Sequence, residues 1–330
     1  MVRDLSAALR RWMDDDAVRG VAIRGMGREA PFATFCAGGD IRFLHRAGHE
    51  GHPDLDAFFA EEYALNHLIH TYPKPYVAFM DGIVMGGGMG ISQGAGLRIV
   101  TERTRMAMPE TAIGFFPDVG GGYFLSRCPG HVGEWLALTG DTIDGTQALA
   151  CGLADVSIAA AEQARIWDVL ATQRFASAEA IREHLAIAVG ASSAGGVSAR
   201  GQIDQYFSAG SVAQILAALE ASDDPWAQAT AATLRKRSPL MLHVVLEQIR
   251  RARSMHLADD LRMELDMAHR CFHLRAAASE SLEGIRALVI DKDHAPRWNP
   301  ATVEAVTSDM IPPFFESPWA SEQHPLRALR

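Results

Sequence analysis

Lysine is scarce in this 330-residue chain, with only Lys74, Lys236 and Lys292 present, so arginine carries nearly all of the positive charge. The chain is also short of positive charge as a whole, because its formal net charge is -9. An acidic protein of this kind repels polyanions, so we expect no nucleic-acid partner. An anionic substrate must then be held locally, by arginines or by backbone amides.

Cysteine is also rare, and the four cysteines form no C-x-x-C pair along the chain. This spacing is typical of reduced thiols in a cytosolic protein and excludes a disulfide framework. Long apolar runs are missing too, since the best candidate, from Tyr76 to Val100, is interrupted by Asp81, Arg98 and several glycines. The N-terminus has no signal-peptide core and carries three consecutive aspartates at 14–16, unlike a transit peptide. We therefore expect a cytoplasmic protein with no membrane partner.

The composition that remains, 48% hydrophobic and 22% charged, is that of an ordinary globular protein with a sizeable core. Strand, turn and helix patterns alternate through the first half, which is typical of an α/β architecture. The second half is rich in alanine and leucine at helical spacing. The sequence therefore predicts an α/β core over residues 1–160 and a mainly helical region over residues 161–330.

Two carboxylates stand in the apolar, Gly/Pro-punctuated stretch at 106–124, which contains no lysine or arginine. A carboxylate that loses water without gaining a cationic partner has a raised pKa, and so suits general acid or base chemistry near neutral pH. Glu110 and Asp118 are therefore candidate catalytic residues. The alternative is structural, with Glu110 capping a helix and Asp118 starting a turn after Pro117.

Two glycine-rich segments, FCAGGD at 35–40 and MGGGMG at 85–90, each precede a predicted helix. Glycines there leave backbone N–H groups uncovered, and two such donors on one oxygen form an oxyanion hole. The alternative is a pair of tight turns that need glycine only for their backbone angles. Neither segment fits the G-x-G-x-x-G or G-x-x-x-x-G-K-[ST] pattern of nucleotide-binding proteins.

Two further motifs compete with this interpretation. Gly90 to Gly94 matches the G-x-S-x-G nucleophile elbow with Ser92 as nucleophile, although glycines rather than a strand precede it. His45, His49 and His52 have a spacing that could hold a metal on one helix. The glycines and the proline among these histidines argue against a continuous helix, so we expect exposed loop histidines and no metal site.

Four segments together carry a resemblance to a known family: FCAGGDI, KPYVAFMDGIVMGGGMGIS, AMPETAIGFFPDVGGGYF and EGIRALVIDKD at 283–293. They resemble the crotonase (enoyl-CoA hydratase/isomerase) superfamily, and most closely its 3-hydroxyisobutyryl-CoA hydrolase branch, over residues 1 to about 315. The resemblance implies a spiral of strand-strand-helix repeats with a helical C-terminal region. Relatives carry about thirty more residues before the first helix, so the fold is expected to lack its first strands, and Met1 is open to question as the true start.

Carried over by position, the resemblance implies that the amides of Gly39 and Gly87 form the oxyanion hole for a thioester carbonyl. Glu110 matches the catalytic glutamate shared with the hydratases, and Asp118 matches the acid beside the hydroxyl end of the substrate. Glu62 matches a further substrate-contact glutamate. Hydratases carry a second catalytic glutamate where this chain has Gly90, which argues against hydratase activity.

The resemblance therefore implies hydrolysis of a short 3-hydroxyacyl-CoA thioester, with 3-hydroxyisobutyryl-CoA of valine degradation as the first candidate. Glu110 would act as general base or as nucleophile. The alternatives are a hydratase or isomerase on the same scaffold and a non-catalytic acyl-CoA-binding homologue. The acyl-CoA substrate is the expected partner, a homo-oligomer is possible, and no metal or other cofactor is expected.

Overall fold

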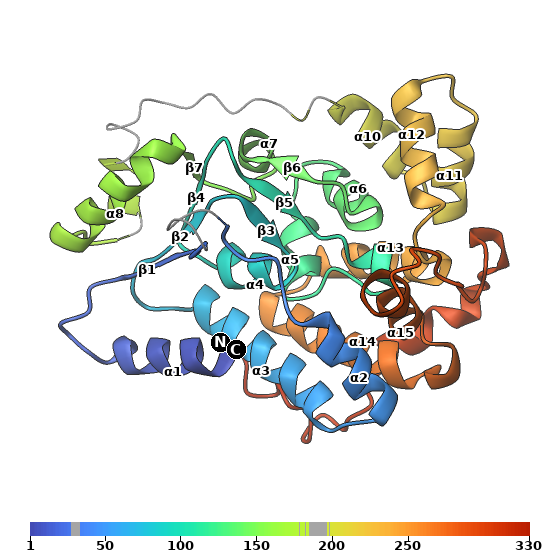
Figure 1. Ribbon diagram of the computed structural model, residues 1–330, viewed down its shortest axis with the longest axis horizontal. Helices are drawn as coiled ribbons and strands as arrows, with labels where there is room; N and C mark the ends of the chain where they lie inside the picture. The colour runs from blue at the N-terminus through green and yellow to red at the C-terminus, as the bar shows by residue number, and fades with distance from the viewer. Residues whose placement is uncertain (28–33, 178, 182, 185–196, 198) are drawn as a thin grey trace. The chain divides into compact units, whose positions relative to one another are not determined.

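The structure is a computed structural model that describes residues 1–27, 34–177, 179–181, 183–184, 197 and 199–330. The chain forms two compact units whose segments alternate along the sequence. Figure 1 traces the chain from blue at the N-terminus to red at the C-terminus and labels its helices and strands. The first unit comprises Met1–Gly38, Ala64–Ala107 and Thr142–Ser198. The second comprises Gly39–Tyr63, Met108–Asp141 and Ala199–Arg330.

The first unit contains two small sheets. A four-stranded parallel sheet has the order β1-β2-β4-β7, and a three-stranded sheet has the order β3-β5-β6, in which β3 and β5 are parallel and β6 is antiparallel. The strands are β1 (Val21–Arg24), β2 (Tyr76–Met80), β3 (Ile83–Met85), β4 (Leu97–Val100), β5 (Arg105–Ala107), β6 (Ile143–Asp144) and β7 (Val156–Ser157). Its helices include α1 (Val2–Met13), α4 (Gly87–Gln93), α7 (Gly145–Ala150) and α8 (Gln163–Thr172).

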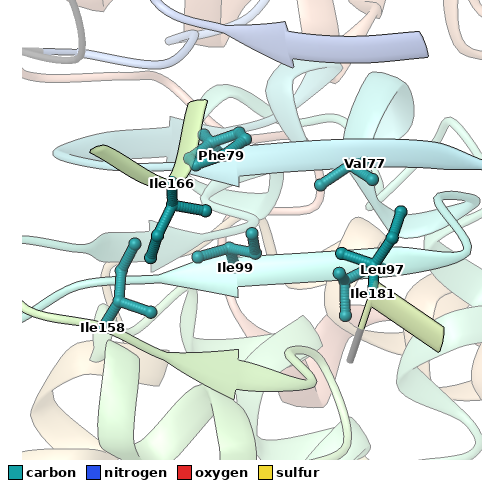
Figure 2. Close-up of a cluster of buried hydrophobic side chains, with 7 residues drawn as sticks. All are labelled: Val77, Phe79, Leu97, Ile99, Ile158, Ile166 and Ile181. Carbon is teal, nitrogen blue, oxygen red and sulfur yellow. The ribbon is translucent and has the colours of Figure 1, made fainter. Parts of the chain in front are cut away.

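Strand β2 lies inside the parallel sheet, and every one of its five residues is buried. A run of apolar residues without alternation is what a parallel strand covered on both faces requires. On one face, Val77 and Phe79 pack with residues of β4 and α8 in the cluster that Figure 2 shows. On the other face, Tyr76 packs with Leu9 of α1 and with the end of α3 (Asp54–His70).

The second unit is helical among its described residues. Helix α13 illustrates how the sequence begins such a helix. Ser238 caps its first turn, and Pro239 occupies the first helical position, where the missing N–H of proline leaves no hydrogen bond unmade. Besides α13 (Pro239–Ala252) and the start of α3, the α-helices are α2 (Ile41–Glu50), α5 (Gly121–Leu125), α6 (Val132–Thr139), α10 (Arg200–Phe207), α11 (Val212–Glu220), α12 (Pro225–Leu234), α14 (Leu257–His273) and α15 (Glu280–Ile285).

The predicted α/β architecture is confirmed, with the helix-rich content expected for the later part of the chain. The last described strand, β7, ends at Ser157. Residue 160 lies close to the point where the secondary structure changes, and as a domain boundary it stays a prediction. The two compact units are defined by contacts between residues, and each is built from three separate stretches of the chain. No helix among the described residues is long and apolar enough to cross a membrane.

The prediction for the histidines at 45–52 was wrong in one respect. Helix α2 continues through Gly48 and ends only at Gly51, whose φ of 59° is left-handed, so His45 and His49 both lie on the helix. Asp40 makes this possible, because its side chain accepts hydrogen bonds from the amides of Arg42 and Phe43. Capping at the start and a glycine at the end therefore outweigh one internal glycine.

The core of the parallel sheet generates a stability prediction. Ile99 is fully buried in the cluster of Figure 2, whereas Ile83 on β3 is 39% exposed. We expect Ile99→Ala to lower the free energy of unfolding by about 2–5 kcal/mol, since it leaves a cavity. Ile83→Ala, the matched control, should cost much less in the same urea titration. Equal losses for the two variants would contradict this account of the core.

Candidate active site

Glu110 follows the short strand β5 and begins the 3-10 turn Glu110–Ile113, which ends at Gly114 in a left-handed conformation. Its side chain is only 8% exposed, and its Oε2 atom has no hydrogen-bond partner among the residues that the structure describes. Buried carboxylate oxygens are nearly always paired, so an unpaired one indicates a place where a ligand or water is bound. The structure thus places Glu110 as a turn residue with a free acceptor.

Asp118 lies in the loop between Pro117 and helix α5, and its side chain is also buried. The Tyr63 hydroxyl on α3 donates a hydrogen bond to its Oδ2 atom over 2.9 Å. Tyr63 is itself fully buried. This bond fixes the orientation of the carboxylate and joins two segments that are 55 residues apart in the chain.

Glu62 precedes Tyr63 on α3 and completes a cluster of three buried acids with Glu110 and Asp118. Burial and, after it, the charge of Asp118 together raise the pKa of Glu62 to about 8. Burial raises the pKa of Asp118 to about 7, although the hydrogen bond from Tyr63 lowers it. Burial, and then the charge of Asp118, raise the pKa of Glu110 well above its ordinary value. No cation is among the causes for any of the three acids, so the pKa values of Glu62 and Asp118 lie near neutral pH and that of Glu110 is raised in the same direction.

Aromatic rings close to these three acids shield them from water. The rings of Phe59 and Phe115 stack with centroids 5.7 Å apart, and each lies about as close to Phe272. Phe59 also contacts Tyr63, with ring centroids 5.9 Å apart. Large apolar rings exclude water, and the low local dielectric strengthens every interaction among the acids.

Two acids that the sequence analysis did not single out hold the loop that carries Asp118. Glu264 accepts hydrogen bonds from the amides of Gly120 at 2.7 Å and Gly122 at 3.0 Å. Asp260, one turn earlier on α14, accepts one from the amide of Tyr123 at 2.9 Å. Both acids are fully buried. We call Asp260 and Glu264 the carboxylate clamp.

The clamp is reinforced from helix α13. Gln248 donates one hydrogen bond to the carbonyl of Pro117 at 2.7 Å and another to Glu264 at 3.2 Å. Between the clamped residues and Pro117, Val119 adopts a φ of 58°, which is rare for a β-branched residue. Such a conformation persists only where the surroundings impose it, so the loop is held rigidly. A sequence signal existed, because two acids four residues apart lie on an otherwise apolar helix face.

Within the first unit, residues 35–38 of the first glycine-rich segment lie beside the second segment. Cys36 donates its amide hydrogen to the carbonyl of Ile83 at 3.0 Å, and Met85 donates back to Cys36 at 3.0 Å. Gly88 must lack a side chain, because a Cβ there would lie 2.3 Å from the Cys36 carbonyl oxygen. A Cβ on Gly38 would lie 3.5 Å from the nitrogen of Gly87, so the end of the first segment reaches the start of α4.

Gly87 is the first residue of α4, and Gly39 directly precedes Asp40, the N-cap of α2. Neither amide donates a hydrogen bond to any residue in the described part of the chain. Gly39 belongs to the second unit and Gly87 to the first, so the oxyanion hole that the two would form stays a prediction.

The nucleophile-elbow alternative disagrees with the structure. Ser92 is fully buried in the body of α4, and its hydroxyl donates to the carbonyls of Gly88 at 2.8 Å and Met89 at 3.2 Å. An elbow serine must instead stand exposed at the sharp turn between a strand and a helix. Ser92 is therefore a structural helix residue.

Residues 1–315 match the family model described as enoyl-CoA hydratase/isomerase. This chain belongs to that family. Its relatives include the mitochondrial 3-hydroxyisobutyryl-CoA hydrolase of Danio rerio, 37% identical over 96% of this chain and 82% of the relative. The 3-hydroxyisobutyryl-CoA hydrolase 1 of Arabidopsis thaliana is 36% identical over 96% of this chain and 84% of its own length. The predicted superfamily and branch are thereby confirmed.

Solved structures agree on the fold. An enoyl-CoA hydratase from Rhodobacter sphaeroides 2.4.1 is 37% identical, with a TM-score of 0.86 over 96% of this chain and 90% of that one. A carnitinyl-CoA dehydratase from Mycobacterium thermoresistibile is 36% identical, with a TM-score of 0.84 over 96% of this chain and 88% of that one. The predicted crotonase-like fold is confirmed for this chain.

The raised acid pKa values predict that stability falls as pH rises. An acid whose pKa is higher in the folded protein keeps its proton while the unfolded chain has lost it, so raising the pH favours unfolding. We expect the free energy of unfolding to decrease between about pH 4.5 and pH 8, the window set by Glu62. Urea titrations across this range measure the slope, which the double variant Glu62→Gln, Asp118→Asn should reduce. An unchanged slope in that variant would contradict the assignment.

The carboxylate clamp predicts a second effect on stability. Glu264→Ala leaves the buried amides of Gly120 and Gly122 without an acceptor, so we expect a loss on the order of 3 kcal/mol. Glu247→Ala on α13 is the matched control, because Glu247 makes only a half-exposed ion pair with Arg251 and should cost below about 1 kcal/mol. Chemical denaturation measures both, and similar losses would rule out the clamp.

Proposed function

We propose that this protein hydrolyses the thioester of a short 3-hydroxyacyl-CoA, first of all 3-hydroxyisobutyryl-CoA to 3-hydroxyisobutyrate and CoA. The observation that carries the proposal is the buried Glu110 carboxylate beside Asp118, one oxygen of which has no hydrogen-bond partner in the part of the chain that the structure describes. The names of the relatives, which match 96% of this chain, support the same activity.

Glu110 carries the central step in this proposal. As general base it takes a proton from water while the water oxygen attacks the thioester carbon. The C–S bond then breaks, and the thiolate of CoA leaves and takes up the proton. As nucleophile it would instead form a transient anhydride that water hydrolyses. Both routes need the ionised carboxylate, so the raised pKa of Glu110 moves the rise of activity with pH above the range of an ordinary glutamate.

Asp118 and Glu62 select the acyl group in this proposal. Tyr63 occupies one acceptor position of the Asp118 carboxylate, and a carboxylate has about four. Another position can accept a hydrogen bond from the substrate hydroxyl, so acyl groups without that hydroxyl are bound poorly. With a pKa of about 8, Glu62 is mostly protonated at neutral pH and can donate a hydrogen bond to the same substrate.

The amides of Gly39 and Gly87 would stabilise the tetrahedral oxyanion. Both N–H groups lack a partner among the described residues, as donors reserved for a substrate must. Loss of one such donor typically raises the barrier by roughly 3–4 kcal/mol. That the hydrolysis itself needs no metal or other cofactor stays part of this proposal, since base, acid and oxyanion donors complete the chemistry.

Hydration of an enoyl-CoA is the second candidate, because the similar solved structures are titled hydratase and dehydratase. Gly90, at the position of the second hydratase glutamate, is buried inside α4 and offers no acid. A lone glutamate is poorly suited to delivering both the hydroxyl and the proton of water across a double bond. This residue is why we favour hydrolysis over hydration.

An acyl-CoA is the partner that the family implies, and assembly into a homo-oligomer stays a prediction. The cytoplasmic location also stays a prediction. The Danio rerio relative is named mitochondrial, so the location of this protein has to be measured in cells.

Thiol release from 3-hydroxyisobutyryl-CoA, followed with a disulfide reagent, tests the proposal. We expect Glu110→Gln to lower kcat by at least about 100-fold, because it removes the base. Asp118→Asn should lower kcat/KM more for the hydroxyacyl substrate than for isobutyryl-CoA. Glu61→Gln, at a neighbouring acid outside the cluster, is the matched control and should remain active.

Three outcomes would contradict the proposal. Full activity of Glu110→Gln would remove Glu110 from the chemistry. Loss of the conjugated absorbance of crotonyl-CoA at a comparable rate would establish the hydratase alternative. No thiol release from any short acyl-CoA, together with saturable binding of acyl-CoA, would establish a non-catalytic binding protein.

A further inference from the structure

A second cluster of ligand-type side chains lies on the surface of the second unit, apart from the acids of the candidate active site. His269 and His273 are four residues apart in the last turns of α14, and Asp56 lies in the first turn of α3. One ligand atom from each of the three side chains lies within 4.8 Å of the others. Among the described residues, these three side chains form the one group of three or more His, Cys, Asp or Glu side chains with ligand atoms this close together.

The spacing of the two histidines explains why they converge. Residues four apart on a helix project from the same face, and two histidines so placed are a recurring pair of zinc ligands. Their ring centroids are 4.3 Å apart. Cys271 lies between them in sequence but points to the opposite, buried side of α14. The ligand set is therefore two imidazoles and one carboxylate, without a thiolate.

Asp56 supplies the third ligand from a different helix. Its carboxylate oxygens lie 3.0 and 3.1 Å from the Nδ1 atom of His269. Ligand atoms around a tetrahedral Zn²⁺ lie roughly 3.3 Å from one another, so this pair already has nearly the required spacing. His273 is exposed, so a rotation of its side chain can complete the set without moving the backbone.

We propose that Asp56, His269 and His273 bind a divalent transition-metal ion, with Zn²⁺ as the best fit. Two histidines and one carboxylate leave at least one position for water, which is ordinary for zinc with three protein ligands. The ion replaces the direct contact between Asp56 and His269 and ties the start of α3 to the end of α14. The site takes no part in the proposed hydrolysis, so it stands or fails independently of that function.

The chain contains its own comparison. His45 and His49 on α2 have the same spacing, with ring centroids 4.5 Å apart. Among the described residues, however, no carboxylate or thiol joins that pair in a group of three. A metal that needs only two helical histidines would bind both pairs, whereas the proposed site needs Asp56.

Trp319 provides a direct readout. Its ring lies 5.2 Å from that of His269. A paramagnetic ion such as Co²⁺ bound to His269 quenches nearby tryptophan fluorescence, and Trp319→Phe should remove that part of the quenching. The remaining five of the six tryptophans serve as an internal baseline.

The experiment uses the full chain without a histidine tag, stripped of metal and titrated with Zn²⁺ by calorimetry and with Co²⁺ by fluorescence. We expect one saturable equivalent, a higher Tm with Zn²⁺, and affinity at least about tenfold lower in Asp56→Asn and in His273→Asn. His49→Asn, the matched control, should bind like the parent. Circular dichroism checks that each variant is folded.

Two results would overturn the proposal. The first is no saturable binding with Zn²⁺ up to about 100 μM, far weaker than structural zinc sites. The second is equal binding by the parent and Asp56→Asn, which would assign the ion to another group of side chains.

Discussion

The constraint on which the candidate site depends is the burial of several carboxylates with no cation among the causes that set the pKa of Glu62, Glu110 or Asp118. Removing a charge from water is costly, and here the acids respond by holding their protons to higher pH. The same effect makes them usable as acid or base near neutrality. Stability and reactivity are therefore opposed in this cluster, and the surrounding structure must hold the acids in place.

The carboxylate clamp shows how this is done. Glu264 and Asp260 accept three backbone hydrogen bonds from the Gly120–Tyr123 segment, which satisfies donors that would otherwise be buried unpaired. Asp118 lies just before this segment in the same loop, next to Val119 in its left-handed conformation. One set of buried acids thus positions another, and helix α14 acts as the support.

The fold and the chemical types of the site residues could be predicted from the sequence. The α/β architecture was recognisable because strand, turn and helix patterns alternate through the first half, and Glu110 and Asp118 stood out because no lysine or arginine lies between 106 and 124. The continuation of the predicted helix through His45 and His49 was missed, because the capping aspartate outweighed Gly48. Ser92 matched a motif whose required backbone setting is absent at this position.

The sequence by itself determined the family, the mixed architecture and the candidate acids. The family follows from sequence motifs, and the architecture and the acids follow from the pattern of residues along the chain. Only the tertiary structure decided which acids lie together in one buried site shielded from water. The Tyr63 hydroxyl reaches Asp118 across 55 positions, and Glu264 reaches Gly120 across 144. Desolvation and hydrogen bonding depend on neighbours in space, so no window along the chain contains the information that sets these pKa values.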